Sequence, residues 1–327
     1  MKHIIQSSWT SARVALLSIG IMPAVITATG CGSEDESGNG SLTVLLEGEE
    51  AKSVRHITDG WAALYDQHIV TVGDIHLRLS ANQSIEKQAA ELFVVDLAKI
   101  PESGLTLWNI EGLRSGRWDF NYKVQGANSN SVRHDSVTEK SYQAMTEKGW
   151  SYYVSGELKK SDGESCPPAS LANPGERTPN GKKSGGNDCY DAPTVRFMFG
   201  ASATTAYGPC EIDNIPGVSI SGTGNRTVSI TIHADHLFFN GFAEGNESGV
   251  TRLAQWLADC DLNLDGTVTE DELKAIAPGQ LPQIDERFQL GGSPLTPLDT
   301  MARYVESQLM TQGHFQGEGE CPMGGGE

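Results

Sequence analysis

No stretch of this sequence is apolar for long enough to cross a membrane. The longest largely apolar run, Val14–Ile26, has 13 residues, whereas a membrane-spanning helix needs about 20. Basic charge is also scarce, because 24 Lys and Arg residues face 42 Asp and Glu residues. A surface this acidic repels nucleic acid and anionic lipid headgroups, so nucleic acid is not expected as a partner.

Signatures of catalysis are missing as well. The glycine-containing segment Gly222–Thr227 fails the dinucleotide-binding pattern, and there is no Walker loop, nucleophile elbow or His-Glu-x-x-His helix. These absences favour a protein that is not an enzyme. They direct attention to the binding of an ion or another ligand.

The N-terminus has the features of an export signal. Two basic residues precede Val14–Ile26, which has the length of a signal-peptide core. Residues 28–31, Ala-Thr-Gly-Cys, resemble a bacterial lipobox, which implies cleavage before Cys31 and its acylation. We predict a lipoprotein signal peptide at 1–30 and a flexible acidic tether at 31–41. The N-terminal lipid would anchor the protein to a membrane of the cell envelope, on the outer membrane or the periplasmic face; an ordinary secretory signal is the alternative.

The most specific pattern in the chain lies at residues 261–272, Asp-Leu-Asn-Leu-Asp-Gly-Thr-Val-Thr-Glu-Asp-Glu. Oxygen donors stand at positions 1, 3, 5, 7, 9 and 12 of this segment, which are Asp261, Asn263, Asp265, Thr267, Thr269 and Glu272. Gly266 provides the sharp turn at position 6, and Val268 is an aliphatic residue at position 8. The segment closely resembles the calcium loop of the EF-hand family, and the resemblance implies that these six residues bind one Ca²⁺ ion.

The sequence on both sides of the loop fits this interpretation. Ser248 can cap an incoming helix that runs to about Asp259, and Thr269 and Glu272 have capping-box spacing for an outgoing helix that stops near Pro278. No second loop is found, although EF-hands usually work in pairs. A single site with three charged ligands predicts a dissociation constant of about 10⁻⁴–10⁻³ M, which suits a structural calcium clamp outside the cytoplasm. An acidic turn that binds nothing is the alternative.

The body of the chain reads as a mainly β fold. Short alternating or β-branched runs are separated by Gly, Pro, Asn and Ser turns. The expected strands are Leu42–Glu47, His68–Leu79, Leu92–Leu97, Leu105–Ile110, Trp118–Val124, Trp150–Leu158, Thr194–Phe199 and Arg226–His233. Helices are expected at Ser136–Lys148 and after a Thr296 cap.

So little helix between strands favours an antiparallel β-sandwich at 42–245. A small C-terminal helical EF-hand subdomain at 246–321 and a disordered tail at 322–327 complete the predicted organisation.

Besides the predicted lipidation site, five cysteines fit an exported protein. Cys166 and Cys189 enclose a segment rich in Pro, Gly, Asn and Ser, and a disulfide between them would hold this long loop. We favour a second disulfide between Cys210 and Cys321, which would pin the C-terminal tail to the body and leave Cys260 buried. Sequence alone does not fix the connectivity, so other pairings stay open.

A second group of potential metal ligands follows the last predicted strand. His233, Asp235 and His236 provide two imidazoles and a carboxylate, and His314 could approach them if the tail is pinned back. A periplasmic transition-metal-handling protein or metalloenzyme is therefore an alternative function. In an ideal strand, however, His236 points away from the other two residues. Hydrogen bonding and packing at the rim of a sandwich is the plainer explanation.

The segments around these histidines, Thr231–Phe238 and Gly313–Cys321, are similar to segments in a group of uncharacterised bacterial lipoproteins that also end in an EF-hand. This similarity implies architecture and brings no known activity. A third possible function is a surface adhesion or binding module, but the sequence identifies no protein or glycan partner. Four tryptophans could line a carbohydrate groove, namely Trp61, Trp108, Trp118 and Trp150. Such residues more often fill the core.

Overall fold

The computed structural model describes residues 38–243 and 249–324. The predicted signal peptide at 1–30, the lipidation site Cys31 and most of the tether at 31–41 lie outside the described residues. Among the helices that are described, none is both long enough and apolar enough to cross a membrane.

The fold is mainly β, as the sequence predicts, with 43% of residues in strands and 16% in helices. The strands are β1 (Asn39–Glu49), β2 (Ser53–Val54), β3 (Ala62–Leu79), β4 (Asn82–Asp96), β5 (Leu105–Leu113), β6 (Gly116–Val124), β7 (Val132–Arg133), β8 (Tyr152–Lys159), β9 (Glu164–Ser165), β10 (Lys183–Ser184), β11 (Asn187–Asp188), β12 (Tyr190–Asp191), β13 (Thr194–Ala201), β14 (Thr205–Tyr207), β15 (Glu211–Ile212), β16 (Ile215–Pro216), β17 (Val218–Ile220), β18 (Thr223–His233), β19 (Thr267–Thr269) and β20 (Gly313–Phe315). The helices are α1 (Glu139–Lys148), α2 (Gln255–Ala258), α3 (Glu270–Ala275), α4 (Ile284–Arg287) and α5 (Met301–Leu309), with 3-10 turns η1 (Leu97–Lys99), η2 (Ala234–Phe238) and η4 (Pro278–Gln280).

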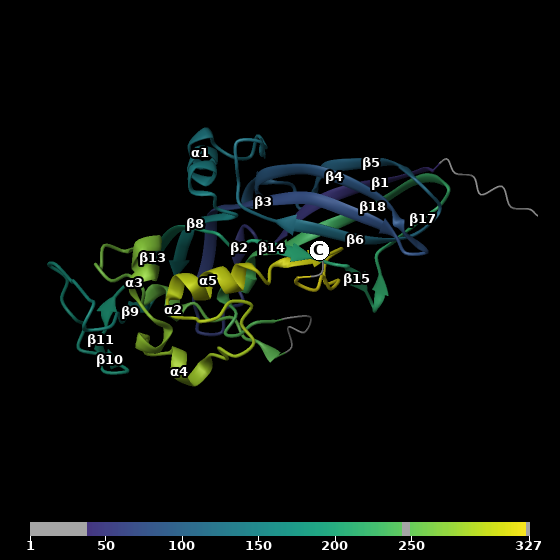
Figure 1. Cartoon of the computed structure of the whole chain (residues 1–327). Coiled ribbons are helices and arrows are strands. Elements are labelled where there is room, and N and C mark those ends of the chain that lie inside the picture. The colour runs from purple at the N-terminus through teal and green to yellow at the C-terminus, as the bar shows by residue number, and fades with distance from the viewer. Residues whose placement is uncertain (1–37, 244–248, 325–327) are drawn as a thin grey trace, which may run out of the picture. The chain divides into compact units, whose positions relative to one another are not determined.

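Two larger sheets carry most of these strands (Figure 1). A four-stranded sheet has the order β20-β18-β1-β5. A ten-stranded sheet, part of which curls into a half-barrel, follows β14-β6-β3-β8-β13-β19, with β2, β4, β7 and β17 attached. The sheets are mixed, which corrects the expectation of purely antiparallel pairing, because β1 runs parallel to β18, β13 to β19 and β4 to β7. Asn39 is paired with Thr223, far along the chain, so no hairpin imposes an antiparallel direction on β1 and β18.

Both sheets contribute to one hydrophobic core. Alternate residues of β1 face inward, and Val44 of β1 belongs to the same buried cluster as Phe120 of β6. Three of the four tryptophans considered for a groove are buried in this cluster, namely Trp61, Trp108 and Trp118. They therefore serve as core residues.

A smaller core covers the opposite face of β3. Helix α1 begins after its N-cap Thr138 and ends at Gly149, which has the left-handed φ of 66° that favours glycine. Met145 of α1 packs in one cluster with Ile69 of β3. Residues 68–73 of β3 are consequently buried without the alternation seen in β1.

The C-terminal region contributes strands to both sheets. β19 lies beside β13, and β20 lies beside β18. The described residues cluster as one compact unit, so the described part of the region predicted as an EF-hand subdomain is integrated with the rest of the fold.

The cap expected at Ser248 lies outside the described residues, and in the described part of the segment up to Asp259 the α-helix is limited to the four residues of α2. Arg252 instead bridges to Phe239, and the N–H of Leu253 donates to the carbonyl of Phe238. Tertiary pairing thus overrides the helical spacing of the apolar residues here. Further along, α5 is capped by Thr300 and not by the expected Thr296.

Both favoured disulfides are present. Cys166 is bonded to Cys189 and Cys210 to Cys321, and Cys260 is a buried free thiol. The second bond ties residues that are 111 positions apart. It therefore holds the C-terminal segment against the body of the fold.

Both ends of the described chain are ordered further than expected. β1 begins at Asn39, inside the predicted tether. Within the predicted tail at 322–327, Met323 bridges to Tyr207, and the N–H of Gly324 donates to the carbonyl of Ala206. The remaining residues, 325–327, lie outside the described part.

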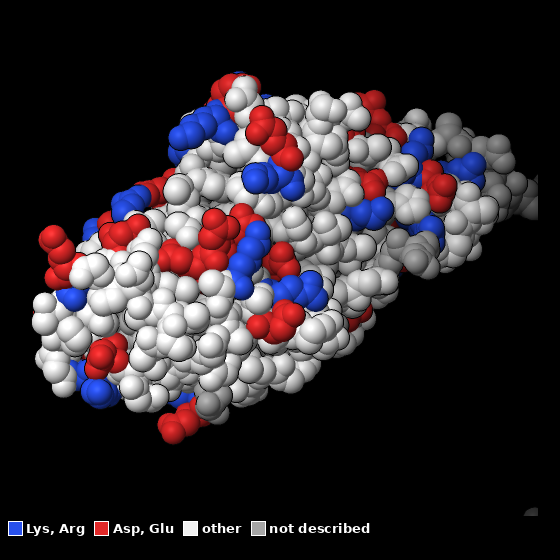
Figure 2. All heavy atoms as spheres, turned by 60° about the vertical axis from the view of Figure 1, so that its left-hand side comes forward, with Lys and Arg blue, Asp and Glu red and all other residues white. Residues whose placement is uncertain are grey.

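The surface of the end that carries β10, β11 and α3 has mixed charge (Figure 2). Acidic and basic side chains are interspersed there, although the whole chain has a formal net charge of −18. The excess negative charge is thus not gathered into one patch on this face.

Candidate functional site

The EF-hand-like loop at 261–272 lies between α2 and α3. β19 occupies its second half, and α3 begins inside it. Oγ1 of Thr269 accepts the N–H of Glu272, while the N–H of Thr269 donates to the Glu272 carboxylate. The predicted capping box is therefore present, and it ties the start of α3 to the last loop position.

The loop backbone contains two left-handed residues, Leu264 with φ of 58° and Gly266 with φ of 86°. No atom lies within 4 Å of the position that a Cβ at residue 266 would take. The backbone conformation, and not crowding, therefore explains the glycine. The N–H of Gly266 donates to Oδ2 of Asp261 at 3.0 Å and closes the first half of the loop.

Polar side chains of the loop hydrogen-bond to its own backbone. Oδ1 of Asn263 accepts the N–H of Asp265 at 2.8 Å, and Oδ1 of Asp265 accepts the N–H of Thr267 at 2.8 Å. Oε1 of Glu272 accepts the N–H of Leu262 at 3.0 Å. The described residues contain several groups of potential metal-ligand atoms that lie within 4.8 Å of one another. The three loop carboxylates do not form such a group. An ion at the loop centre would therefore require these side chains to turn inward.

Asp261 bears the strongest mark of a cation site. The residue is buried, and its Oδ1 is a buried atom without a hydrogen-bond partner. Burial raises the pKa of Asp261 to about 6; the charges of Glu272 and Asp265 add to the rise, and the N–H of Gly266 opposes it. A divalent cation would satisfy this oxygen and favour the ionised form. The donors are hard oxygens, so the residues present fit Ca²⁺.

The larger sheet supplies the strand partner that a second EF-hand usually provides. Val268, at position 8, is fully buried and lies in parallel register with Phe197 of β13. The N–H of Arg196 donates to the carbonyl of Gly266 at 2.8 Å. Sequence reasoning missed this partner because the pairing is non-local and covers only three residues.

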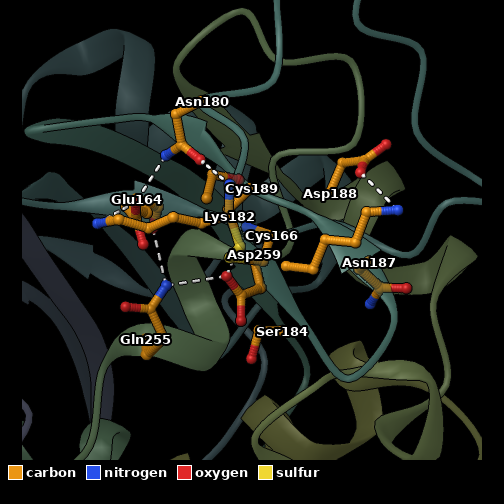
Figure 3. Close-up of a disulfide and its surroundings, with 12 residues drawn as sticks. Glu164, Cys166, Asn180, Lys182, Ser184, Asn187, Asp188, Cys189, Gln255 and Asp259 are labelled. Carbon is orange, nitrogen blue, oxygen red and sulfur yellow. Dashed lines mark hydrogen bonds and ion pairs between the residues drawn. A yellow bond between two sulfur atoms is a disulfide. The ribbon is translucent and has the colours of Figure 1, made fainter.

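The start of the loop is also tied to the Cys166–Cys189 disulfide (Figure 3). One carboxylate oxygen of buried Asp259 accepts the N–H of Cys166 at 2.8 Å and the side-chain amide of Gln255 at 2.9 Å. Burial raises the pKa of Asp259 to about 7, although these two hydrogen bonds oppose the rise. The disulfide-closed segment, α2 and the loop entrance thus form one connected unit.

Three histidines come together beyond the end of β18. His233 is the last residue of β18, His236 lies in η2, and His314 lies in β20. All three are buried, and one ring nitrogen from each lies within 4.8 Å of the others. The ring centroids of His233 and His314 are 4.2 Å apart. The change from strand to 3-10 turn brings His236 beside His233, which an ideal strand would not do.

Asp235 does not join this group. Its carboxylate is ion-paired with the guanidinium of Arg252, whose Nε lies 2.7 Å from Oδ2. Of the four residues considered as metal ligands, the structure brings the three histidines together, whereas Asp235 is engaged in the ion pair with Arg252. Sequence spacing could not reveal the ion pair, because Arg252 belongs to the segment that was expected to be helical.

His314 is positioned by β20 and by the second disulfide. β20 pairs with β18 so that His314 lies opposite Thr231, and the chain soon reaches the bond at Cys321. A Cβ on Gly313 would lie 2.4 Å from the ring of Tyr207. Glycine therefore allows this strand to pass closely over the buried tyrosine.

No protein-family model, curated protein or solved structure matches the chain.

His68 is a buried titratable group that the sequence did not single out. Burial lowers the pKa of His68 to about 4; a hydrogen bond to Gln312 and the charge of Asp235 work in the opposite direction. In the unfolded chain the pKa of His68 is about 6.5. At pH values between the two pKa values, the unfolded chain binds a proton at His68 that the folded protein does not bind. The free energy of unfolding therefore falls as the pH falls through this range. We expect this residue to lower the free energy of unfolding by about 2 kcal/mol between pH 8 and pH 5.

Denaturant unfolding of His68→Gln at these two pH values checks this expectation. The free-energy difference between wild type and variant should shift by about 2 kcal/mol in favour of the variant at pH 5. The same exchange at exposed His56 is the control. An equal difference at both pH values would mean that His68 does not carry the effect.

Proposed function

We propose that the protein is a lipid-anchored, extracytoplasmic calcium-binding protein in which one Ca²⁺ ion stabilises the C-terminal region. The observation that carries the proposal is the buried, unpartnered Oδ1 of Asp261 within a loop of EF-hand spacing. The ligands in this proposal are Asp261, Asn263, Asp265, Thr267, Thr269 and Glu272.

The mechanism we infer is charge compensation. Five carboxylates fall within twelve residues, and their mutual repulsion opposes closure of the loop. They belong to Asp261, Asp265, Glu270, Asp271 and Glu272. The bound ion supplies two positive charges at this point, so its binding free energy adds to the stability of the folded state.

The ion would act on the sheet as well as on the helices. Thr267, Thr269 and Glu272 belong to β19 and to the capping box of α3. Because β19 pairs with β13, an ordered loop also secures one edge of the ten-stranded sheet. A structural clamp of this kind does not need the exposed hydrophobic groove of a calcium sensor.

Two further parts of the proposal rest on the sequence. Cys31 would carry the lipid that fixes the protein to the cell envelope, on the outer membrane or the periplasmic face. The two larger sheets would face each other as a β-sandwich, an arrangement supported by their shared core. Two disulfides are in keeping with an extracytoplasmic location.

Replacement of Glu272 with glutamine tests the proposal. At a dissociation constant of about 10⁻⁴–10⁻³ M, 10 mM Ca²⁺ should stabilise the wild type by about 1.4–2.7 kcal/mol, or roughly 2–4 °C in melting temperature. Glu272→Gln should abolish this rise because it removes the carboxylate at position 12. Glutamine keeps one oxygen for the capping box, but its amide nitrogen cannot accept the N–H of Leu262, so the metal-free variant should melt below the metal-free wild type. The quantity to compare is therefore the calcium-dependent rise of each protein.

Asp271→Asn is the matched control, because it removes an adjacent, exposed charge at a position that is not a ligand. The control should keep the calcium-dependent rise in thermal melts with and without chelator. An unchanged rise in Glu272→Gln would place the ion elsewhere and overturn the proposal.

A further inference from the structure

We propose that His233, His236 and His314 form a second metal site, which binds a late first-row transition-metal dication such as Cu²⁺ or Zn²⁺. This site shares no residue with the calcium clamp, and its ligands are nitrogen atoms instead of oxygen atoms. Three neutral imidazoles suit Zn²⁺ and Cu²⁺, whereas Ca²⁺ takes oxygen ligands.

The spacing of the ring nitrogens fits a metal after a small adjustment. One nitrogen from each ring lies within 4.8 Å of the others. Metal–nitrogen bonds of about 2.0–2.1 Å in tetrahedral geometry require nitrogens about 3.3 Å apart. Each ring nitrogen would need to move by less than about 1 Å, which a small change in side-chain torsion provides.

The structure already orients the ring of His236 as a ligand. The hydroxyl of Thr311 donates to the carbonyl of Gln308 at 2.8 Å, so its oxygen accepts from Nδ1 of His236 at 3.1 Å. A proton on Nδ1 places the lone pair on Nε2. Outer partners of this kind fix the tautomer of histidine ligands in metal sites.

The ring of His233 is fixed in a similar way. Its Nε2 lies 3.4 Å from the carbonyl oxygen of Gly317 and 3.5 Å from the carboxylate of Glu49, both of which are acceptors. This arrangement favours the tautomer with its proton on Nε2 and its lone pair on Nδ1. Carboxylates of Glu49 and Glu318 both approach His233, and their charge favours a cation at this place.

A cavity beside His314 is the route by which we propose that the metal reaches the site. This residue lines a cavity of about 230 Å³ together with Tyr207, Thr311 and Met323. Three protein ligands would leave a coordination position for water or another small ligand, as in open metal sites. Access from this cavity would allow an exchangeable metal, unlike a site closed on all sides.

The alternative is a buried aromatic cluster without a metal. The ring of His236 stacks on Phe239 with centroids 4.3 Å apart, so packing accounts for part of its placement. Packing does not require ring nitrogens from three separate elements to converge. It also does not require the acceptors that orient two of the rings.

Metal loading of the whole protein tests the site. Chelator-treated protein is returned to 5 mM Ca²⁺, mixed with Zn²⁺ or Cu²⁺, freed of unbound metal by gel filtration and analysed for its elements. We expect one Zn²⁺ or Cu²⁺ per chain in the wild type and in Glu272→Gln. Competition with a coloured chelator should show that His236→Asn and His314→Asn each weaken affinity by about 100-fold or more.

Two controls separate ligand loss from unfolding. His56→Asn, at an exposed histidine outside the cluster, should bind like wild type. Thr311→Val, which removes the positioning hydroxyl and no ligand, should weaken affinity by about 10–100-fold and alter the Cu²⁺ spectrum. A retained circular dichroism spectrum would establish that each variant is folded.

Equal metal content in wild type and both histidine variants would overturn the site, as would a wild type that retains no metal. X-ray absorption of the loaded wild type should show three nitrogen ligands, and oxygen ligands alone would also overturn it. Loss of the calcium response in a protein that still binds Zn²⁺ or Cu²⁺ would count against the calcium clamp only.

Discussion

Replacing Cys210 and Cys321 together with alanine should lower the free energy of unfolding by about 5 kcal/mol, the largest effect we expect. The disulfide closes a loop of 111 residues. In the chain-entropy model, a loop of this length restricts the unfolded chain strongly and contributes about 4.8 kcal/mol. Denaturant unfolding of the double variant under oxidising conditions measures the loss.

The first disulfide provides the matched control. Cys166 and Cys189 are 23 residues apart, so the Cys166→Ala/Cys189→Ala variant should lose about 3.4 kcal/mol in the same model. The difference between the two variants should therefore be about 1.4 kcal/mol. A larger loss from the shorter loop would contradict the entropic explanation and would point to local packing instead.

The second large effect is expected at Trp256, which is fully buried in α2. Its ring meets Tyr304 of α5 edge-on, with centroids 5.4 Å apart. Truncation to alanine would remove this contact and leave a cavity between the two helices. We expect Trp256→Ala to lower the free energy of unfolding by about 3–5 kcal/mol.

Trp256→Phe is the control for this position. The indole N–H is buried without a hydrogen-bond partner, so phenylalanine loses no hydrogen bond and keeps an aromatic contact with Tyr304. Chemical denaturation should give a much smaller loss than that of the alanine variant. Similar losses of unfolding free energy in both variants would mean that phenylalanine cannot replace the indole and that the cavity does not explain the effect.

The parts of the fold that the sequence predicted are those governed by local rules. The inward-facing alternation of β1 follows from period-two burial, whereas the last six residues of β18 are all buried because both of its faces are covered. The cap at Thr269 and Glu272 depends on residues three positions apart, so the sequence contains it in full. The left-handed turn at Gly266 is local in the same way.

The parts that the sequence missed depend on distant partners. Residues 250–254 have helical apolar spacing, but Arg252 pairs with Phe239 and its guanidinium binds Asp235. That contact engages Asp235 in an ion pair that the sequence did not indicate. The parallel pairing of β1 with β18 and of β13 with β19 also joins segments far apart in the chain, where no turn indicates the direction.

The histidine cluster lies between these cases. His233 and His236 are close in sequence, whereas His314 arrives through β20, which pairs with β18. The expectation that a pinned tail could bring His314 near the other two is met, because the Cys210–Cys321 bond holds the segment that follows β20. The sequence could not supply the 3-10 turn that redirects His236.

The calcium clamp is tested most directly by isothermal titration calorimetry of the chelator-treated protein with Ca²⁺ at constant ionic strength. The account predicts binding of one ion per chain with a dissociation constant of about 10⁻⁴–10⁻³ M, and no such binding in Glu272→Gln. Absence of any binding heat at millimolar Ca²⁺, together with an unchanged melting temperature, would contradict it.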